Sequence, residues 1–349
     1  MIGDELIGAS RAIASAWTEA AAAVAGIPLP QPPLLAQTPR DELPLEGGAR
    51  LLHFRGAANI AKPILLVPSL INRWYVLDLR PRASLVEALV GAGFDVWLLD
   101  WGTPEPEDRY LDWDSVLRRL GRAHRRVVRE TGSSKIGLFG YCMGGTLTAI
   151  HAAQHADSLA AFVTLAAPID FSKGGMLRQM VDPRWFDADA IADAGNVAPS
   201  QMQAGFTALR PTLELAKMMS QPDLATDPAA REGFLALEAW ASDNIPFPGE
   251  AYRRYITEMY QRNELANGTH HANGKHAKLS SITCPVLAIT ATRDQICPPP
   301  AATALLSLVG SKDTSELSVP GGHVGAVVGS KAASTMYPGL IKWLAPRLA

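Results

Sequence analysis

The chain has 349 residues, of which 48% are hydrophobic and 19% are charged, and its formal net charge is -2. This composition indicates a globular protein with a large core, and the near-neutral charge excludes a protein that holds nucleic acid on a strongly basic surface. No run reaches the roughly 18 apolar residues of a membrane-spanning helix. The sequence does not open on a basic secretion signal, so we expect a cytoplasmic protein.

Cysteine and histidine usage gives no sign of a disulfide framework or a metal motif. Cys142, Cys284 and Cys297 are too few for such a framework and suit a reducing compartment. Histidines cluster in one Gly/Asn-rich loop: His270, His271 and His276. A weak metal site at these histidines is the alternative, but they lack a Cys or an acidic partner at the spacing of metal-binding motifs, so we expect no metal site.

Residues 1–49 precede the expected core. An Ala-rich amphipathic helix is predicted over 1–26, followed by an extended, Pro-rich connector at 27–33. Leu51–Phe54 then predicts an edge strand. The fully apolar run Ile64–Val67 predicts a buried, central strand of a parallel sheet.

The next segments alternate between helix and strand patterns. We expect a helix at 84–92, a strand at 96–99, a long amphipathic helix at 113–129, and strands at 136–139 and 161–165. Such alternation predicts an α/β protein with a mostly parallel, doubly wound sheet. The basic runs in the long helix indicate a solvated face.

Residues 171–278 break this pattern, because they contain helical segments but no clear buried strand. The expected helices cover 200–209, 213–219, 232–240 and 251–261. An insertion at this point of an α/β fold predicts a mainly helical cap over an active site. Strands at 285–290 and 316–319 and a C-terminal helix then complete the sheet, so the expected core comprises 50–170 and 279–349.

A nucleophile elbow connects the strand at 136–139 to the helix that follows it. The motif Gly-x-Cys-x-Gly at 140–144 has Cys142 at the nucleophile position. The turn is so sharp that only glycine fits two residues before and two residues after the nucleophile, where Gly140 and Gly144 stand. The next helix would point its N-terminus at the thiol and favour a thiolate. The alternative is a buried structural cysteine in a Gly-rich turn.

Three residues occur in the order nucleophile, acid, histidine that α/β-hydrolases use: Cys142, Asp294 and His323. Asp294 and His323 each follow an expected strand, on the loops where this fold presents its acid and base. His323 would take the thiol proton, and Asp294 would orient the imidazole and stabilise its cationic form. Their order and positions predict a catalytic triad, although an isolated Asp or His at such a place is usually structural.

Two backbone N–H groups are expected to form the oxyanion hole. One belongs to Met143, the residue after the nucleophile. The other comes from the loop after Ile64–Val67, from either Leu70 or Ile71, for which ordinary packing is the alternative role. These donors would stabilise the tetrahedral intermediate.

A cysteine nucleophile also limits the class of substrate. Attack by a thiolate on a thioester produces another thioester, so the acyl group stays activated. If the cap keeps the site dry, water competes poorly for that acyl group. We therefore expect acyl transfer from a thioester to a hydroxyl in preference to hydrolysis.

From about residue 50 to its end, the chain resembles the polyhydroxyalkanoate synthases, in particular the short catalytic subunit of class III, with class IV as a near relative. The resemblance rests on the segments 68–79, 100–102, 140–145, 285–287 and 321–325 together with Asp294. Gln295 departs from the family, which usually has His after the catalytic Asp, and Ser69 stands where Pro is often found. Gln keeps hydrogen bonding but loses the titratable group.

The resemblance implies an enzyme that polymerises (R)-3-hydroxyacyl-CoA, of short chain such as 3-hydroxybutyryl-CoA, into polyester with release of CoA. The cysteine would carry the growing chain, the histidine would activate the cysteine, and the aspartate would help to activate the monomer's 3-hydroxyl. No cofactor is implied, because the CoA thioester is a substrate. The resemblance also implies a homodimer, a second synthase subunit and a location at the surface of cytoplasmic polyester granules.

Two other interpretations stay open. A cysteine α/β-hydrolase, such as a thioesterase or a dienelactone-hydrolase-like enzyme, shares the elbow, but the insertion at 171–278 is larger than a minimal hydrolase needs. The second interpretation is a granule-associated scaffold protein with an inactive site. The presence of all three catalytic residue types argues against it.

Overall fold

The structure is a computed structural model and describes residues 33–56, 62–209 and 227–349. The helix expected over 1–26 and the helix expected at 213–219 lie outside the described residues, as does nearly all of the connector at 27–33.

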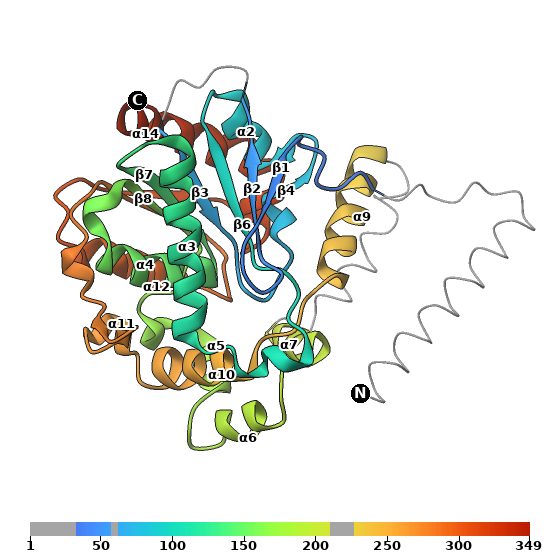
Figure 1. Ribbon diagram of the computed structural model, residues 1–349. Coiled ribbons are helices and arrows are strands. Elements are labelled where there is room, and N and C mark those ends of the chain that lie inside the picture. The colour runs from blue at the N-terminus through green and yellow to red at the C-terminus, as the bar shows by residue number, and fades with distance from the viewer. Residues whose placement is uncertain (1–32, 57–61, 210–226) are drawn as a thin grey trace, which may run out of the picture.

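An eight-stranded sheet runs through the centre of the described chain, with helices on both of its faces (Figure 1). The order across the sheet is β1 (Asp41–Pro44), β2 (Arg50–Phe54), β6 (Val96–Asp100), β3 (Ile64–Val67), β7 (Ile136–Tyr141), β8 (Leu159–Leu165), β11 (Val286–Ala291) and β12 (Thr314–Val319). β2 pairs antiparallel with both of its neighbours, and every other pairing in this sheet is parallel.

Alternate residues of β3 point into two separate cores, one on each face of the sheet. Leu65 and Val67 belong to one core, and Ile64 and Leu66 belong to the other. The first core also contains residues of α3 (Trp113–Thr131), α4 (Met143–Gln154) and α12 (Pro299–Leu308), and the second contains residues of α2 (Leu85–Gly91) and α14 (Tyr337–Leu348). The predicted doubly wound α/β arrangement is therefore confirmed.

One strand at the edge of the sheet was missed by the sequence analysis. The strand expected at Leu51–Phe54 is β2, but it is not at the edge, because β1 covers its outer side. β1 has the sequence Asp-Glu-Leu-Pro, and its residues are mostly exposed. Acidic residues and proline are poor strand formers but suit an edge, where they discourage pairing with another chain.

The cap is mainly helical in its described part. Its elements are α5 (Gly175–Met180), α6 (Ala188–Asp193), α7 (Pro199–Ala208), α9 (Pro228–Ser242), α10 (Gly249–Arg254), a π-helix (Tyr255–Gln261), α11 (Glu264–Asn267) and the hairpin strands β9 (His271–Ala272) and β10 (Lys275–His276). The single helix expected at 251–261 is thus an α-helix that continues directly into a π-helix.

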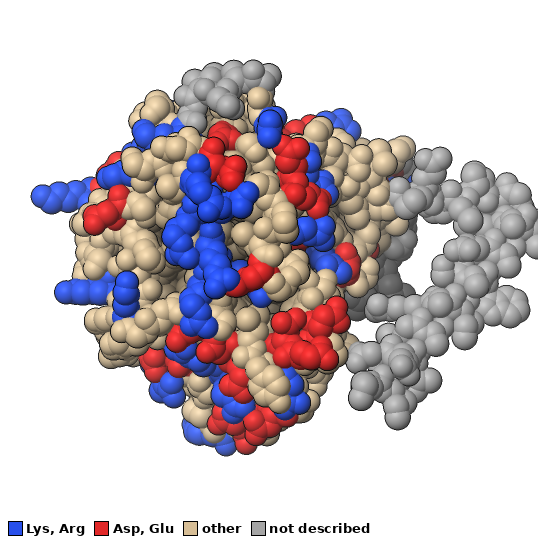
Figure 2. All heavy atoms as spheres, in the orientation of Figure 1, with Lys and Arg blue, Asp and Glu red and all other residues tan. Residues whose placement is uncertain are grey.

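The charges of α3 lie on its solvent side. Figure 2 shows Lys and Arg side chains gathered in a stripe on the face of the molecule where α3 lies, and Arg118, Arg122, Arg125 and Arg129 are exposed. Arg119 instead turns inward, is only 6% exposed and directs Nη1 at the carbonyl of Trp101, 3.4 Å away. Across the described ranges, no helix is both long and apolar enough to cross a membrane.

Candidate active site

Cys142 occupies a sharp turn between a buried strand and a buried helix. β7 ends at Tyr141 and α4 begins at Met143, and Cys142 between them has φ 56° and ψ -128°. A non-glycine residue adopts a positive φ only under strain, and such strain concentrates at functional sites. The turn places the thiol at the N-terminus of α4, where the helix dipole favours negative charge.

The two flanking glycines are required by close backbone packing, as the sequence predicted. A Cβ on Gly144 would collide with the carbonyl oxygens of Val67 and Pro68. A Cβ on Gly140 would collide with the hydroxyl of Thr148 and, at 2.5 Å, with Cα of Gly145. The elbow therefore packs directly against the end of β3, which brings the loop after that strand next to the nucleophile.

Asp294 and His323 meet at the carboxyl ends of β11 and β12. His323 Nδ1 lies 2.7 Å from Asp294 Oδ2, and both side chains are buried. The other oxygen of Asp294, Oδ1, accepts the N–H groups of Ile296 and Cys297, each at 2.9 Å. These bonds fix the carboxylate, so that it holds the imidazole in one orientation.

The electrostatics of the site favour a charged imidazole. Burial alone would lower the pKa of His323, but the neighbouring Cys142 and the Asp294 carboxylate outweigh burial and raise that pKa to about 10. A hydrogen bond between His323 and Cys142 contributes in the same direction. The three predicted residues thus form one connected group, with His323 between the thiol and the carboxylate.

An apolar cavity of about 240 Å³ opens at Cys142. Its core-side wall includes Ile71, Met143 and Pro168. The cap contributes most of the remaining lining residues, among them Met180, Phe186, Met202, Phe206, Phe247, Tyr255 and Tyr260. Of the two candidate loop residues for the oxyanion hole, Ile71 lines this cavity, whereas Leu70 is not among the lining residues and is buried in the core.

The loop that carries Ile71 is attached to the end of α9. Asp243 accepts hydrogen bonds from Arg73 Nε at 3.0 Å and from the Tyr75 hydroxyl at 2.7 Å. Asn72 donates to the Asn244 side chain at 2.6 Å, and the indole of Trp240 donates to the carbonyl of Arg73 at 3.0 Å. A cap helix therefore helps to hold the loop in place beside the nucleophile.

Sequence reasoning missed two tyrosines in the wall of the cavity. Tyr255 and Tyr260 are buried, share a hydrogen bond and feel the charge of Cys142, which together with burial raises the pKa of each hydroxyl. Residues five apart lie on different faces of an α-helix, but the wider turns of a π-helix bring them close to one face. The π-helix gave no recognisable signal in the sequence.

Two further positions singled out by the sequence do not line the cavity at Cys142. Gln295, which follows the acid, is exposed and does not line the cavity at Cys142. Cys297 is fully buried near Asp294 and Cys142, and burial raises the pKa of its thiol.

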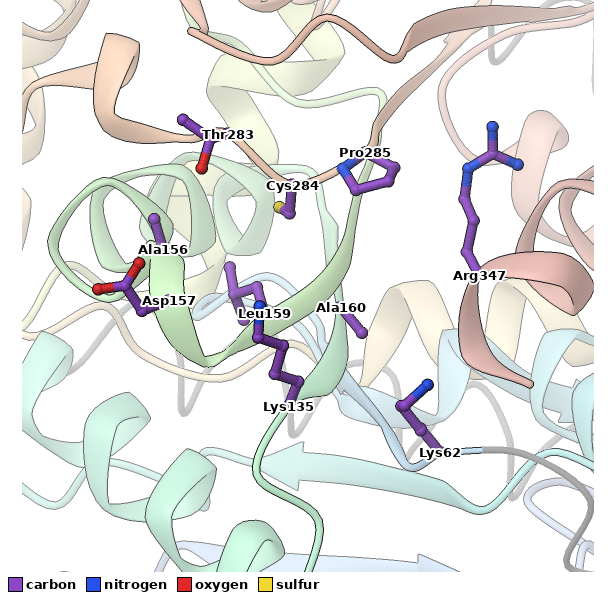
Figure 3. A pocket seen from close by; sticks show the side chains of 10 residues that line it. All are labelled: Lys62, Lys135, Ala156, Asp157, Leu159, Ala160, Thr283, Cys284, Pro285 and Arg347. Atoms are coloured by element: carbon purple, nitrogen blue, oxygen red, sulfur yellow. The ribbon is translucent and has the colours of Figure 1, made fainter.

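A second cavity, of about 420 Å³, lies at the opposite edge of the sheet, where β7, β8 and β11 begin (Figure 3). Lys62, Lys135 and Arg347 give it a basic lining, and Cys284 forms part of its wall. Burial raises the pKa of the Cys284 thiol to about 11, so that it stays protonated near neutral pH. This cavity contains none of the three predicted catalytic residues.

Comparisons with known proteins agree with this geometry. Residues 62–329 match the family model of the alpha/beta hydrolase fold. The poly(3-hydroxyalkanoate) polymerase subunit PhaC of Allochromatium vinosum is 36% identical over 291 residues, which cover 82% of this chain and 81% of that protein. The subunit of the same name from Haloferax mediterranei is 33% identical over 319 residues, which cover 90% of this chain and 65% of that protein.

Similarity to solved structures supports the fold alone. A soluble variant of monoglyceride lipase from Saccharomyces cerevisiae shares 15% sequence identity and has a TM-score of 0.56, covering 91% of this chain and 100% of that one. The sequence relatives are closer and cover most of the described core. The chain therefore belongs to the poly(3-hydroxyalkanoate) polymerase family, within the α/β-hydrolase fold.

Proposed function

We propose that the protein polymerises short-chain (R)-3-hydroxyacyl-CoA, such as 3-hydroxybutyryl-CoA, into polyester and releases CoA, with Cys142 as the covalent acyl carrier. The observation that carries the proposal is the position of Cys142: it stands at the N-terminus of α4, in hydrogen-bonding contact with His323, in an apolar cavity covered by the cap. This arrangement suits acyl transfer because it combines an activated thiol with a dry acyl site.

The first half-reaction loads the cysteine. His323 takes the proton of the Cys142 thiol, and the thiolate attacks the thioester carbonyl of the substrate. The N–H groups of Met143 and Ile71 stabilise the tetrahedral oxyanion. The intermediate then expels CoA, which leaves as a thiol with the proton from His323, and the acyl group remains on Cys142 as a new thioester.

The second half-reaction makes the ester. The 3-hydroxyl of another acyl-CoA loses its proton to His323, with Asp294 close by to assist, and attacks the thioester on Cys142. The ester bond forms, the cysteine leaves as a thiol with the proton from His323, and the chain is one monomer longer. It carries a CoA thioester at its end, so it can load Cys142 again.

The lining of the cavity supports a small, apolar acyl group. Its volume of about 240 Å³ is below the roughly 300–1,000 Å³ of ligand pockets for drug-sized molecules. Side chains such as Met180, Phe186 and Phe206 offer it no hydrogen bonds. The methyl group of 3-hydroxybutyrate fits such surroundings, whereas water gains little there.

The test follows free thiol and turbidity together after 3-hydroxybutyryl-CoA is added to the purified protein. We expect CoA release with formation of insoluble polyester, and neither from Cys142→Ala. Cys284→Ala is the matched control, because Cys284 lies in the wall of the opposite cavity, and it should behave as wild type. Thiol release without insoluble product would favour a thioesterase-like hydrolase, and undiminished release from Cys142→Ala would exclude Cys142 as the nucleophile.

We also propose that the protein acts as a class III-type catalytic subunit, as a homodimer with a second synthase subunit, at the surface of cytoplasmic polyester granules. Support comes from the sequence relatives that carry the name polymerase subunit. Repeating the polymerisation assay with and without a candidate partner subunit tests this, and an equal rate in both would argue against a partner.

A further inference from the structure

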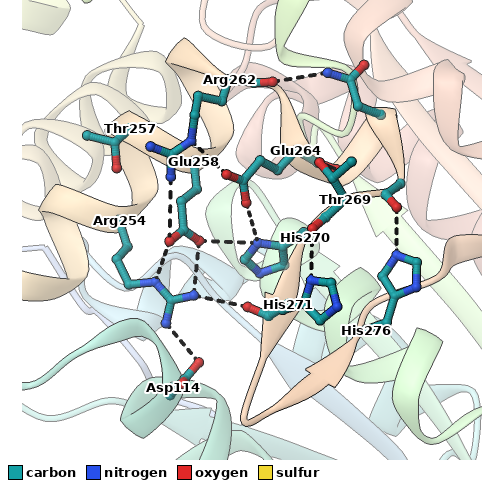
Figure 4. Close-up of polar contacts among 12 residues, drawn as sticks. Asp114, Arg254, Thr257, Glu258, Arg262, Glu264, Thr269, His270, His271 and His276 are labelled. Carbon is teal, nitrogen blue, oxygen red and sulfur yellow. Dashed lines mark hydrogen bonds and ion pairs between the residues drawn. The ribbon is translucent and has the colours of Figure 1, made fainter.

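Three side chains of types that ligate metals converge outside the active site, where the π-helix, α11 and the hairpin of β9 and β10 meet within the cap (Figure 4). Glu258 lies on the π-helix, Glu264 is the first residue of α11, and His270 directly precedes β9. We call these three residues the carboxylate–imidazole cluster. None of them lines the cavity at Cys142.

The spacing of the cluster fits a single ion. His270 Nδ1 lies 3.2 Å from Glu258 Oε2 and 3.5 Å from Glu264 Oε2. One ligand atom from each of the three residues lies within 4.8 Å of the other two. Ligand atoms that share one tetrahedral Zn²⁺ at about 2.0–2.2 Å lie roughly 3.3–3.6 Å apart. Two of the three separations are therefore close to those of a shared ion.

His270 independently indicates a missing ligand. Its side chain is completely buried, and Nδ1 makes ion-pair contacts with Glu258 and Glu264. Among the described residues, neither ring nitrogen has a partner that is aligned as a hydrogen bond. Buried polar groups are nearly always paired, so such a ring requires an explanation. Nδ1 faces the two carboxylates, and an ion bound between Nδ1 and the carboxylate oxygens would give Nδ1 a partner.

Two arginines hold the carboxylates from the outer side of the cluster. Arg254 donates to both oxygens of Glu258, at 2.8 and 3.0 Å, and to Asp114 at 2.9 Å. Arg262 donates to Glu264 Oε1 at 2.7 Å, which leaves Oε2 of Glu264 to face His270. Such outer contacts orient metal ligands in known sites.

The net charge around the cluster is negative and favours binding of a cation. Asp114, Glu258 and Glu264 carry three negative charges, and Arg254 and Arg262 carry two positive charges, which leaves one negative charge when His270 is neutral. Arg254 holds the Glu258 carboxylate in place, and its Oε2 lies 3.2 Å from Nδ1 of His270, where it is available as a ligand.

We propose that Glu258, Glu264 and His270 bind a divalent transition-metal ion, with Zn²⁺ the best match and water completing its coordination. One imidazole nitrogen and two carboxylate oxygens form a donor set that Zn²⁺ accepts, whereas Ca²⁺ and Mg²⁺ prefer oxygen ligands alone. The sequence indicated at most a weak site at His270, His271 and His276, and it missed Glu258 and Glu264, because these come from two earlier elements of the cap and form no local motif with His270.

The ion has a structural role. The hairpin is anchored to the core, because Gln154 at the end of α4 donates to the carbonyls of Ala272 and Lys275 at 2.9 and 3.0 Å. Through His270 and Glu258, the ion joins this hairpin to the π-helix that carries Tyr255 and Tyr260 into the cavity wall. Binding to the folded state alone stabilises that state in proportion to ion concentration and affinity.

The test measures Zn²⁺ binding directly, in the full untagged chain carrying Cys142→Ala. This substitution removes a thiolate that would itself bind Zn²⁺. The protein is stripped with a chelator, reloaded with Zn²⁺ and dialysed to remove free ion, after which we expect close to one Zn²⁺ per chain by elemental analysis. Adding Zn²⁺ to the stripped protein should raise its Tm. Because these readouts do not depend on polymerisation, the outcome is independent of the proposed function.

Matched variants locate the ion. Glu264→Gln keeps the size of the side chain, and it should weaken Zn²⁺ binding at least ten-fold, as should His270→Asn. Glu250→Gln removes a carboxylate that pairs with Arg253 on the neighbouring α10, and it should bind as the parent does. His271→Gln breaks the exposed stack of His271 on His276 and should also bind normally.

Three results would overturn the proposal. The first is a parent protein that takes up no Zn²⁺. The second is binding that survives Glu264→Gln and disappears in His271→Gln, which would assign the ion to the surface stack. The third is a protein whose Tm rises when the pH is lowered and does not change when Zn²⁺ or a chelator is added. In that case a proton on His270, and not a metal ion, would balance the charge of the two carboxylates. Circular dichroism of each variant separates loss of binding from loss of folding.

Discussion

His323 Nδ1 lies 2.7 Å from Asp294 Oδ2, although β12 and α12 separate the two residues in the chain. We expect Asp294→Asn to keep the fold but to lower kcat for CoA release by roughly 10³–10⁴-fold, because the amide can stabilise neither the correct tautomer nor the imidazolium. Stopped assays with 3-hydroxybutyryl-CoA measure this. Asp313→Asn, on a carboxylate that pairs with Arg347, is the control and should leave kcat unchanged. A comparable loss in both variants would contradict the assigned role.

The charge on His323 makes stability depend on pH. Its pKa rises from the ordinary 6.5 to about 10 in the folded protein, since Cys142 and Asp294 outweigh the opposing effect of burial. A raised folded-state pKa means that the stabilisation is fully present below pH 6.5 and is lost as the pH rises through about 10. The free energy of unfolding of wild type, relative to His323→Gln, should therefore shrink over that interval.

Urea unfolding of both proteins across this pH range checks the expectation. Cys142→Ala removes a contact that raises the pKa of His323, so the decline should begin at lower pH than in wild type. A difference between wild type and His323→Gln that stays constant with pH would show that the imidazole is not held in its charged form.

The contact of Asp243 with Arg73 and Tyr75 should affect catalysis more than stability. We expect Asp243→Ala to lower kcat by roughly 10- to 100-fold, because a small displacement of the loop would misplace Ile71, the oxyanion donor that we propose. The free energy of unfolding should change by less than about 1 kcal/mol, as for other exposed ion pairs. Steady-state kinetics and urea unfolding of the same variant separate the two effects. An increase in KM with unchanged kcat would instead point to substrate binding.

Phe186 lines the cavity at Cys142, and we predict that it limits the length of the acyl group that the cavity accepts. Phe186→Ala should raise the ratio of kcat/KM for 3-hydroxyhexanoyl-CoA to that for 3-hydroxybutyryl-CoA by about ten-fold, the usual value of one or two methylenes in an apolar pocket. Trp185→Ala is the neighbouring control, since that side chain is 62% exposed and does not line the cavity. If the two variants changed the ratio alike, the effect would come from general loosening of the cap.

The sequence predicted those elements whose structure depends on neighbouring residues in the chain. The apolar run Ile64–Val67 is buried along its whole length, and Gly140 and Gly144 are required by the elbow they define. Asp294 and His323 were found because each follows a strand, and the ends of parallel strands meet at one edge of the sheet.

Features that depend on distant contacts could not be found in this way. β1 has no strand propensity of its own and forms because β2 offers it a partner. Tyr255 and Tyr260 face the cavity only because the helix widens to a π-helix. Tertiary packing brings Glu258 and Glu264 next to His270 from other elements of the cap.

The three cysteines differ sharply in solvent accessibility, and this allows Cys142 to be labelled selectively. Cys284 and Cys297 are 8% and 2% exposed, and burial raises the pKa of both thiols, whereas Cys142 is partly exposed. A thiol-reactive fluorophore applied briefly near neutral pH should thus label wild type once, in the cavity, without removal of the other cysteines. Its emission would report polarity in the cavity, and slower labelling in the presence of 3-hydroxybutyryl-CoA would show that the substrate occupies Cys142.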